Sequence, residues 1–116
     1  MEAQTTDWTI EEYVTARGEN LVLSFLSGQT GKVKTEAIAL FKLLKERGNT
    51  LGMPHSKSLG QGLFELRGTQ VRIFYIFRAG HRITLLDGML KKQDRIPQRT
   101  LKRLKRFQQA VEATTK

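Results

Sequence analysis

The chain has 116 residues and a net charge of +9, with 39% hydrophobic and 27% charged residues. This length and composition predict one folded domain spanning residues 1–116 rather than a disordered chain. The absence of cysteine excludes disulfides, thiolate catalysis and cysteine-ligated zinc, and the presence of two histidines argues against a histidine-rich metal site.

The first half of the chain predicts one strand and two helices. Residues 8–13 are rich in β-formers and predict an edge strand. Asn20 is a suitable N-cap for a short helix that Gly28 ends. Apolar residues at helical spacing from Val33 onward predict an amphipathic helix of about four turns, which ends at Gly48. We expect these two helices to form a hairpin that packs on a sheet.

The second half predicts a loop, three strands and a last helix. Residues 52–62 are expected to form the main loop. Three runs rich in β-branched and aromatic residues follow it, at 63–67, 71–77 and 81–90. After a polar exit, Pro97 is suited to open a helix with apolar residues on one side. The predicted order is β-α-α-β-β-β-α, an α+β fold with a small antiparallel sheet and helices against one of its faces.

The positive charge is concentrated in the second half of the chain. Residues 67–106 hold 12 Lys or Arg and two acidic residues, a net charge of +10, whereas residues 1–66 carry a net charge of −1. We therefore expect a surface that binds phosphates or an acidic partner. No apolar run approaches the ~20 residues that span a bilayer, and the first residues lack the pattern of a secretory signal. No membrane partner and a cytoplasmic location are expected.

Glu65, Arg67 and Arg72 form the central candidate site. Glu65 and Arg67 are two residues apart on one predicted strand, so they share a face of the sheet. If Gly68-Thr69 forms a two-residue turn, Glu65 lies opposite Arg72 and all three side chains share that face. A loop one residue longer would send Arg72 to the other face. With cations from 91–95 nearby, a concave face of this kind would hold a phosphodiester.

The chemistry open to such a site is cleavage of RNA without a metal or another cofactor, because RNA carries its own nucleophile, the 2′-hydroxyl. Arg67 and Arg72 are the candidates to stabilise negative charge on the phosphate. Lys91 or Lys92 is the candidate for proton transfer. Two further candidate catalytic residues are Glu65, a base that its ion pairs would weaken, and Tyr75, through its hydroxyl.

Basic residues beyond this cluster are candidates for RNA binding. They are Lys57, Arg95, Arg99, Lys102, Arg103 and Arg106. Each feature also fits a plain structural role: Glu65–Arg67 as a surface ion pair, the paired lysines as a solvated turn, and the basic helix face as solvated surface. Spacing alone therefore supports a module that binds RNA or phosphate and does not establish an enzyme.

Four motifs in the second half resemble the RelE/ParE toxin superfamily, and most closely its phage-derived, HigB-like branch. They are LGQGLFELR at 59–67, VRIFY at 71–75, LLDGMLKK at 85–92 and IP at 96–97. The branch has the similar patterns GLYELR, YRVLY, LLHGFxKK and TP. The first half is similar more loosely, through an opening Trp8, Asn20 before the short helix, and the run from Leu40 to Gly48.

The resemblance implies a RelE-like fold and the toxin of a type II toxin–antitoxin system, typically a metal-independent endoribonuclease that cuts mRNA in the ribosomal A site. The implied partners are the 70S ribosome, mRNA and a small antitoxin with a helix-turn-helix domain, through which alone operator DNA is contacted. Matching the family motifs assigns catalytic roles to Arg67, Arg72, Lys91 and Lys92.

Two departures from the family pattern bear on the chemistry. Asp87 stands where many relatives have a histidine, which argues against histidine acid–base catalysis, and Ile96 stands where they have a threonine. Two other functions fit the superfamily: a ParE-like inhibitor that binds DNA gyrase, and an inactive module that binds RNA or an antitoxin. Because binding alone would not require the Arg67, Arg72 and lysine set, the endoribonuclease is the favoured hypothesis.

Overall fold

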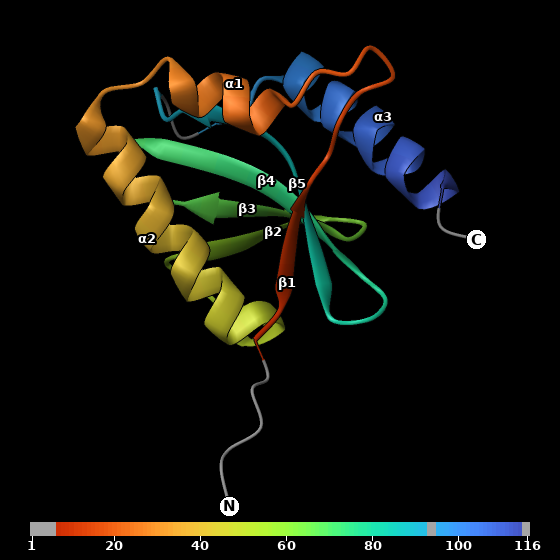
Figure 1. The fold of residues 1–116 in the computed structure, drawn as a ribbon, viewed down its shortest axis with the longest axis horizontal. Coiled ribbons are helices and arrows are strands. Elements are labelled where there is room, and N and C mark those ends of the chain that lie inside the picture. Colours follow the sequence, from red (N-terminus) through yellow and green to blue (C-terminus); the bar gives the residue numbers. More distant parts are fainter. Residues whose placement is uncertain (1–6, 93–94, 115–116) are drawn as a thin grey trace, which may run out of the picture.

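The structure, a computed structural model, describes residues 7–92 and 95–114 and contains one five-stranded sheet with helices on both sides (Figure 1). The elements in chain order are β1 (Thr9–Glu12), α1 (Leu21–Ser27), α2 (Gly31–Arg47), the short 3-10 helix η1 (Gly48–Thr50), β2 (Ser56–Gly60), β3 (Leu63–Arg67), β4 (Val71–Arg78), β5 (Arg82–Leu90) and α3 (Gln98–Ala113). The predicted α+β class and the main elements are confirmed. Within the described residues, no helix has the length and apolarity needed to cross a membrane.

The sheet has the strand order β1-β5-β4-β3-β2. Strands β3, β4 and β5 pair antiparallel in chain order, as expected for the three predicted strands, β2 adds to them antiparallel to β3, and β1 lies at one edge as expected. However, β1 runs parallel to β5, with Ile10 opposite Ile83, so the sheet is mixed and not wholly antiparallel. The connection through both helices carries the chain from β1 at one edge of the sheet to β2 at the other.

The prediction that helices pack against one face of the sheet holds for the α1–α2 hairpin, and α3 lies on the other face. Helices α1 and α2 cover one face, over an apolar cluster that includes Leu44, Ile73 and Tyr75. Helix α3 covers the opposite face, over a second cluster that includes Phe74 and Leu104 (Figure 1). Alternate residues of β4 enter the two clusters, so this central strand is buried on both sides and each side needs its own helical layer.

A second strand lies within the predicted 52–62 loop. Residues Ser56–Gly60 form β2, an edge strand paired antiparallel with β3. The sequence pattern does not indicate this strand, because most of its side chains are polar and exposed and glycines flank it. An edge strand needs little apolar surface to be stable. This strand matters for the site because it places Lys57 directly opposite Glu65.

The end of α2 is fixed by the side chain of Trp8. A Cβ at Gly48 would overlap the Trp8 indole ring, and Gly48 has a φ of 51°, so both the space and the backbone require glycine. The Trp8 backbone N–H donates to the Lys45 carbonyl at 2.9 Å, and the indole stacks on His81 with ring centroids 3.9 Å apart. These contacts join α2 to the β4–β5 hairpin.

Glu36 of α2 holds the β3–β4 turn. Its carboxylate accepts hydrogen bonds from the backbone N–H and the hydroxyl of Thr69, both at 2.7 Å, and from the Gln70 N–H at 3.0 Å. Thr69 and Gln70 form the turn itself, because the Gly68 N–H donates to the Val71 carbonyl at 2.8 Å. The predicted Gly68-Thr69 turn is therefore wrong by one residue, and Arg67, not Glu65, lies opposite Arg72.

These hydrogen bonds make the stability of the protein depend on the charge of Glu36. Partial burial raises the pKa of the Glu36 carboxyl, but the hydrogen bonds from Thr69 and Gln70 outweigh it and lower the pKa below its usual 4.5. Because the folded pKa is lowered, the contribution is present above the unfolded pKa and is lost as pH falls through the folded value. We expect Glu36→Gln to lower the unfolding free energy near neutral pH by about 0.5–1 kcal/mol. Urea unfolding of both proteins along a pH series should show this difference shrinking below about pH 4.5. A difference independent of pH would contradict the role given to the charge.

Candidate functional site

Glu65, Arg67 and Arg72 lie together on the face of the sheet that α3 covers. Arg72 Nη1 is 3.0 Å from Glu65 Oε2, and Arg67 Nε is 3.6 Å from Glu65 Oε1. All three side chains share one face because Arg67 pairs with Arg72 across the hairpin and Glu65 is two residues away. The predicted grouping thus holds, although the register that produces it differs from the predicted one.

The two arginines differ in exposure, and this difference separates their roles. The side chains of Arg72 and Glu65 are 3% and 2% exposed, whereas that of Arg67 is 18% exposed. Arg67 Nε makes no hydrogen bond to a described residue, and Arg67 Nη1 has a long contact of 4.0 Å to the Met53 sulfur. Arg67 is therefore the more accessible of the two arginines to an anion, while Arg72 is held in the buried ion pair with Glu65.

A cleft opens beside this cluster, between the sheet and the start of α3, and we name it the α3-side cleft. It comprises two adjoining hollows of about 330 and 120 Å³, which share Arg72, Arg95 and Ile96. Lys57 and Glu65 line the larger hollow, and Lys92 lines the smaller one. The remaining lining residues are Leu59, Met89, Leu90, Pro97, Gln98 and Leu101.

The α3-side cleft and its margin are strongly cationic. Lys57, Arg72, Lys92 and Arg95 line it and Arg67 lies beside it, while Glu65 is the one carboxylate among the described lining residues. This balance favours a phosphodiester, whose oxygens could accept from guanidinium and ammonium groups on several sides. In the described residues, no group of three or more His, Asp or Glu side chains is placed to hold a metal ion.

The predicted lysine pair is divided between two hollows. Lys92 lines the α3-side cleft with Arg72. Lys91 instead lines a separate pocket beside α2, and its backbone N–H donates to the Gln70 carbonyl at 2.8 Å. The chain leaves β5 after Leu90, so the two neighbouring lysines are no longer equivalent. Of the pair, Lys92 is the one placed with Arg72.

Tyr75 lies on the opposite face of the sheet from Glu65, which corrects its assignment as a possible catalytic residue. Its side chain is fully buried in the cluster beneath α2, and its hydroxyl pairs with the hydroxyl of Ser56. Burial raises the pKa of the Tyr75 hydroxyl, an effect that the hydrogen bond to Ser56 only partly offsets. Buried and bonded in this way, Tyr75 cannot reach a ligand in the α3-side cleft.

The candidate RNA-binding residues of α3 fall into two groups. Arg99, Lys102 and Arg106 are exposed on its outer side. Arg103 Nη2 instead pairs with Asp87 Oδ2 of β5 at 2.7 Å, and its guanidinium lies 5.9 Å from the Phe107 ring centroid. Asp87, at the position where relatives have histidine, is thus placed to fasten α3 to the sheet.

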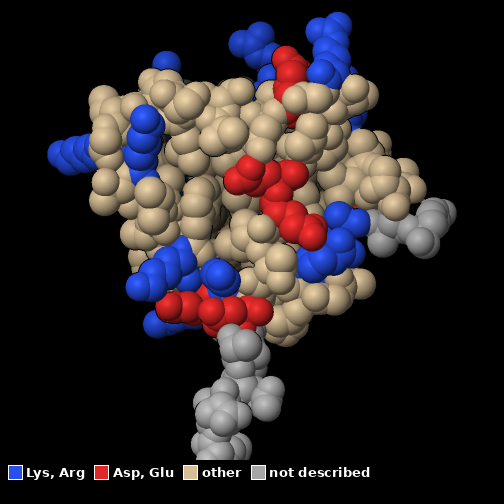
Figure 2. Space-filling view, viewed as in Figure 1, with Lys and Arg blue, Asp and Glu red and all other residues tan. Residues whose placement is uncertain are grey.

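Charge is distributed differently on the face that α1, β1 and α2 present. Figure 2 shows basic and acidic side chains intermixed on this face, separated by large uncharged areas. Residues 1–66, which supply α1, β1 and α2, carry a net charge of −1. The cationic cleft lies on the other face of the sheet, beneath α3. Its cations come from the basic stretch 67–106 and from Lys57.

Sequence reasoning assigned Lys57 to RNA binding alone, and the structure gives it a more central place. It lies opposite Glu65 in the strand register and lines the same hollow as Arg72, so it faces the cluster from the β2 side. The alternation of Lys57 with Ser56 and Ser58 could have indicated a strand, but the glycines around β2 made this segment look like a loop. Glu36 and the pocket beside α2 also carried no sequence signal, because both depend on contacts between distant segments.

Comparison with known structures defines the class of fold. The chain is similar to a chain in the crystal structure of the RelBE2 toxin–antitoxin complex from Mycobacterium tuberculosis, with a TM-score of 0.55 and 15% sequence identity. The match covers 72% of this chain and 98% of the other. At this identity the likeness establishes a shared fold, and it agrees with the RelE-like fold that the motifs predicted.

The family follows from the sequence. Residues 24–108 match the family described as Phage derived protein Gp49-like (DUF891), and since this is most of the chain, the protein belongs to that family. The expected place in the phage-derived branch of the RelE/ParE superfamily is confirmed. A comparison with curated proteins gives no match.

Proposed function

We propose that this protein is the toxin of a type II toxin–antitoxin pair and that it cuts mRNA on the ribosome. The observation that carries the proposal is the α3-side cleft, where Arg72 and Lys92 meet Lys57 beside the partly exposed Arg67. Family membership and the fold shared with a chain of a toxin–antitoxin complex support the coarser statement, that it is a toxin with an antitoxin partner.

In the proposed reaction the 2′-hydroxyl oxygen of the RNA attacks the adjacent phosphorus. The bond from phosphorus to the 5′-oxygen breaks, giving a 2′,3′-cyclic phosphate and a 5′-hydroxyl end. Arg67 and Arg72 stabilise the negative charge that develops on the phosphate oxygens. The hydroxyl proton leaves to a base, and the departing oxygen gains a proton. We assign these two transfers to Lys92 and Lys57, which line the two hollows of the cleft.

Glu65 has a supporting role in this scheme. Its carboxylate lies between two guanidinium groups and is almost fully buried, so it is poorly placed to collect a proton from RNA. It instead fixes the positions of Arg67 and Arg72, which aligns both donors before the substrate binds. The exposed Arg99, Lys102 and Arg106 then contact ribosomal RNA, and the antitoxin, a small helix-turn-helix protein, links the pair to operator DNA.

Primer extension on a defined mRNA tests the proposal, with the purified chain added in the presence or absence of translating 70S ribosomes. We expect new 5′ ends that require the ribosome and that disappear when the cleaved nucleotide carries 2′-deoxyribose in place of ribose. A folded, toxic protein that produces no cuts would overturn the enzyme assignment. DNA damage on expression would then favour inhibition of gyrase.

A further inference from the structure

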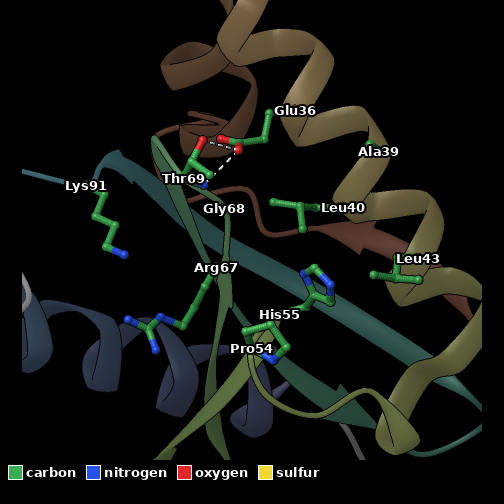
Figure 3. Close-up of a pocket in the computed structure, with 10 residues that line it drawn as sticks. All are labelled: Glu36, Ala39, Leu40, Leu43, Pro54, His55, Arg67, Gly68, Thr69 and Lys91. Carbon is green, nitrogen blue, oxygen red and sulfur yellow. Dashed lines mark hydrogen bonds between the residues drawn. The ribbon is translucent and has the colours of Figure 1, made fainter.

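A second hollow lies on the α2 side of the sheet, and the scheme above does not use it. This α2-side pocket has a volume of about 500 Å³ and lies between α2, the loop before β2 and the end of the β3–β4 hairpin (Figure 3). Its volume is within the range of sites that bind small molecules, about 300–1,000 Å³. It is larger than either hollow of the α3-side cleft.

The walls of the α2-side pocket are mainly apolar and its rim is cationic. Leu40 and Leu43 of α2 form one wall, and Pro54 and the ring of His55 face them from the loop (Figure 3). Lys91 and the base of the Arg67 side chain border the pocket at its other side. A flat apolar group could therefore lie between the walls while an attached anion binds at the rim.

Glu36 does not cancel the attraction of this rim for an anion. It also lines the pocket, but its carboxylate oxygens accept the hydrogen bonds from Thr69 and Gln70 and point at the turn. Lys91 is left as the cation of the described lining at this rim, because the Arg67 guanidinium points away from α2 (Figure 3) and pairs with Glu65. The chemistry of a planar, largely apolar group next to an anion is that of a nucleotide, with its base and its phosphate.

Arg67 connects the two hollows. Its side chain starts at the border of the α2-side pocket, while its guanidinium pairs with Glu65 beside the α3-side cleft. The consecutive lysines repeat this arrangement, since Lys91 lines the pocket and Lys92 lines the cleft. A single RNA strand that crosses this end of the sheet would meet a cation on each side of the crossing.

We propose that the α2-side pocket binds one nucleobase of the RNA, next to the phosphate that Arg67 contacts. Leu43, Pro54 and His55 enclose the base, and Lys91 binds its phosphate. The choice of RNA as the ligand rests on the proposed function. The pocket thereby selects which nucleotide lies beside the cut, a role distinct from the chemistry in the α3-side cleft.

The test fills the pocket and leaves the cleft intact. Ala39 is exposed on α2 and lines the pocket, so Ala39→Phe places a ring in it without disturbing the core. Ile38→Phe is the matched control, because Ile38 directly precedes Ala39 on the same helix, is 65% exposed and does not line the pocket. His55→Ala is a second variant, which removes the imidazole ring from one wall of the pocket. His55 is exposed.

Binding is measured by NMR on the free protein with AMP, GMP, CMP and UMP as probes and with orthophosphate as the comparison. We expect at least one nucleotide to shift the amide signals around Ala39 and His55, with affinity at least tenfold weaker in Ala39→Phe and unchanged in Ile38→Phe. In primer extension, Ala39→Phe should change which nucleotides are cut. Nucleotides that shift only the signals that orthophosphate shifts would overturn the inference.

Two further outcomes separate this inference from the proposed function. If the nucleotides bind as expected and no RNA is cut, the base pocket stands and the nuclease assignment fails. If RNA is cut at the same sites by wild type and Ala39→Phe, with no nucleotide shifts, the nuclease stands and the base pocket fails. Loss of antitoxin binding in Ala39→Phe, again without nucleotide shifts, would overturn the inference in favour of a protein contact.

Discussion

Arg67→Ala is expected to lower ribosome-dependent mRNA cleavage by about 10²–10³-fold while the protein stays folded. Arg67 has a partly exposed side chain that its ion pair with Glu65 holds in position, so its loss removes a positioned donor for the phosphate. The fold should survive because Arg67 is 3.6 Å from Glu65, whereas Arg72 supplies the closer charge. Primer extension under single-turnover conditions gives the rate, and circular dichroism gives the fold.

Arg82→Ala is the matched control for this result. Arg82 is also a strand arginine paired with a glutamate, since its Nη1 lies 3.5 Å from Glu11 Oε1. It begins β5, at the end of the β4–β5 hairpin far from Met89, which lies opposite Arg72. Its removal should leave the cleavage rate within about twofold of wild type. Equal losses in both variants would show that general loss of positive charge, and not the position of Arg67, controls the rate.

Glu65→Ala is expected to destabilise the fold by about 3–5 kcal/mol, which is the largest stability effect we predict for the site. The reason is the burial of Arg72, whose side chain is 3% exposed and lies 3.0 Å from the Glu65 carboxylate. Without Glu65 the guanidinium charge stays buried and loses the counter-charge that lies 3.0 Å from it. Equilibrium unfolding in urea, followed by circular dichroism, measures the change.

Two comparisons test the cause of that loss. Glu11→Ala breaks a partly exposed ion pair with Arg82 and should cost less than about 1 kcal/mol. The double variant Glu65→Leu, Arg72→Leu removes both buried charges and should recover much of the stability lost in Glu65→Ala. If the double variant is as unstable as the sum of the single variants, the penalty comes from lost packing and not from an uncompensated charge.

Local patterns were sufficient to predict most of the elements. The N-cap at Asn20, the helical spacing from Val33 and the β-rich runs after Gly62 each reflect contacts within a few residues, and the structure contains all of them. The hidden strand β2 shows the limit of this approach. Its stability comes from pairing with β3, and that pairing leaves little mark on its own polar sequence.

The candidate site could be predicted in part, for the same physical reason. Strand alternation correctly placed Glu65 and Arg67 on one face, and Arg72 joins them because the turn has two residues, as expected, although it lies one residue later in the chain. Tyr75 was included for its hydroxyl alone, although alternation along β4 puts it on the opposite face from Arg72, beneath α2. Adjacency of Lys91 and Lys92 could not predict two different hollows, since this depends on how the chain leaves β5.

The position of α3 on its own face of the sheet has a consequence for the order of events in folding. All five strands precede α3 in the chain, so the sheet can form while the Glu65–Arg72 pair is still in water, where bringing two charges together costs little desolvation. Docking of α3 then covers the second apolar cluster, and Gln98 and Leu101 close the wall beside that pair. The packing of α3 therefore completes both a core and a site, and a chain without its last helix would lack the cleft.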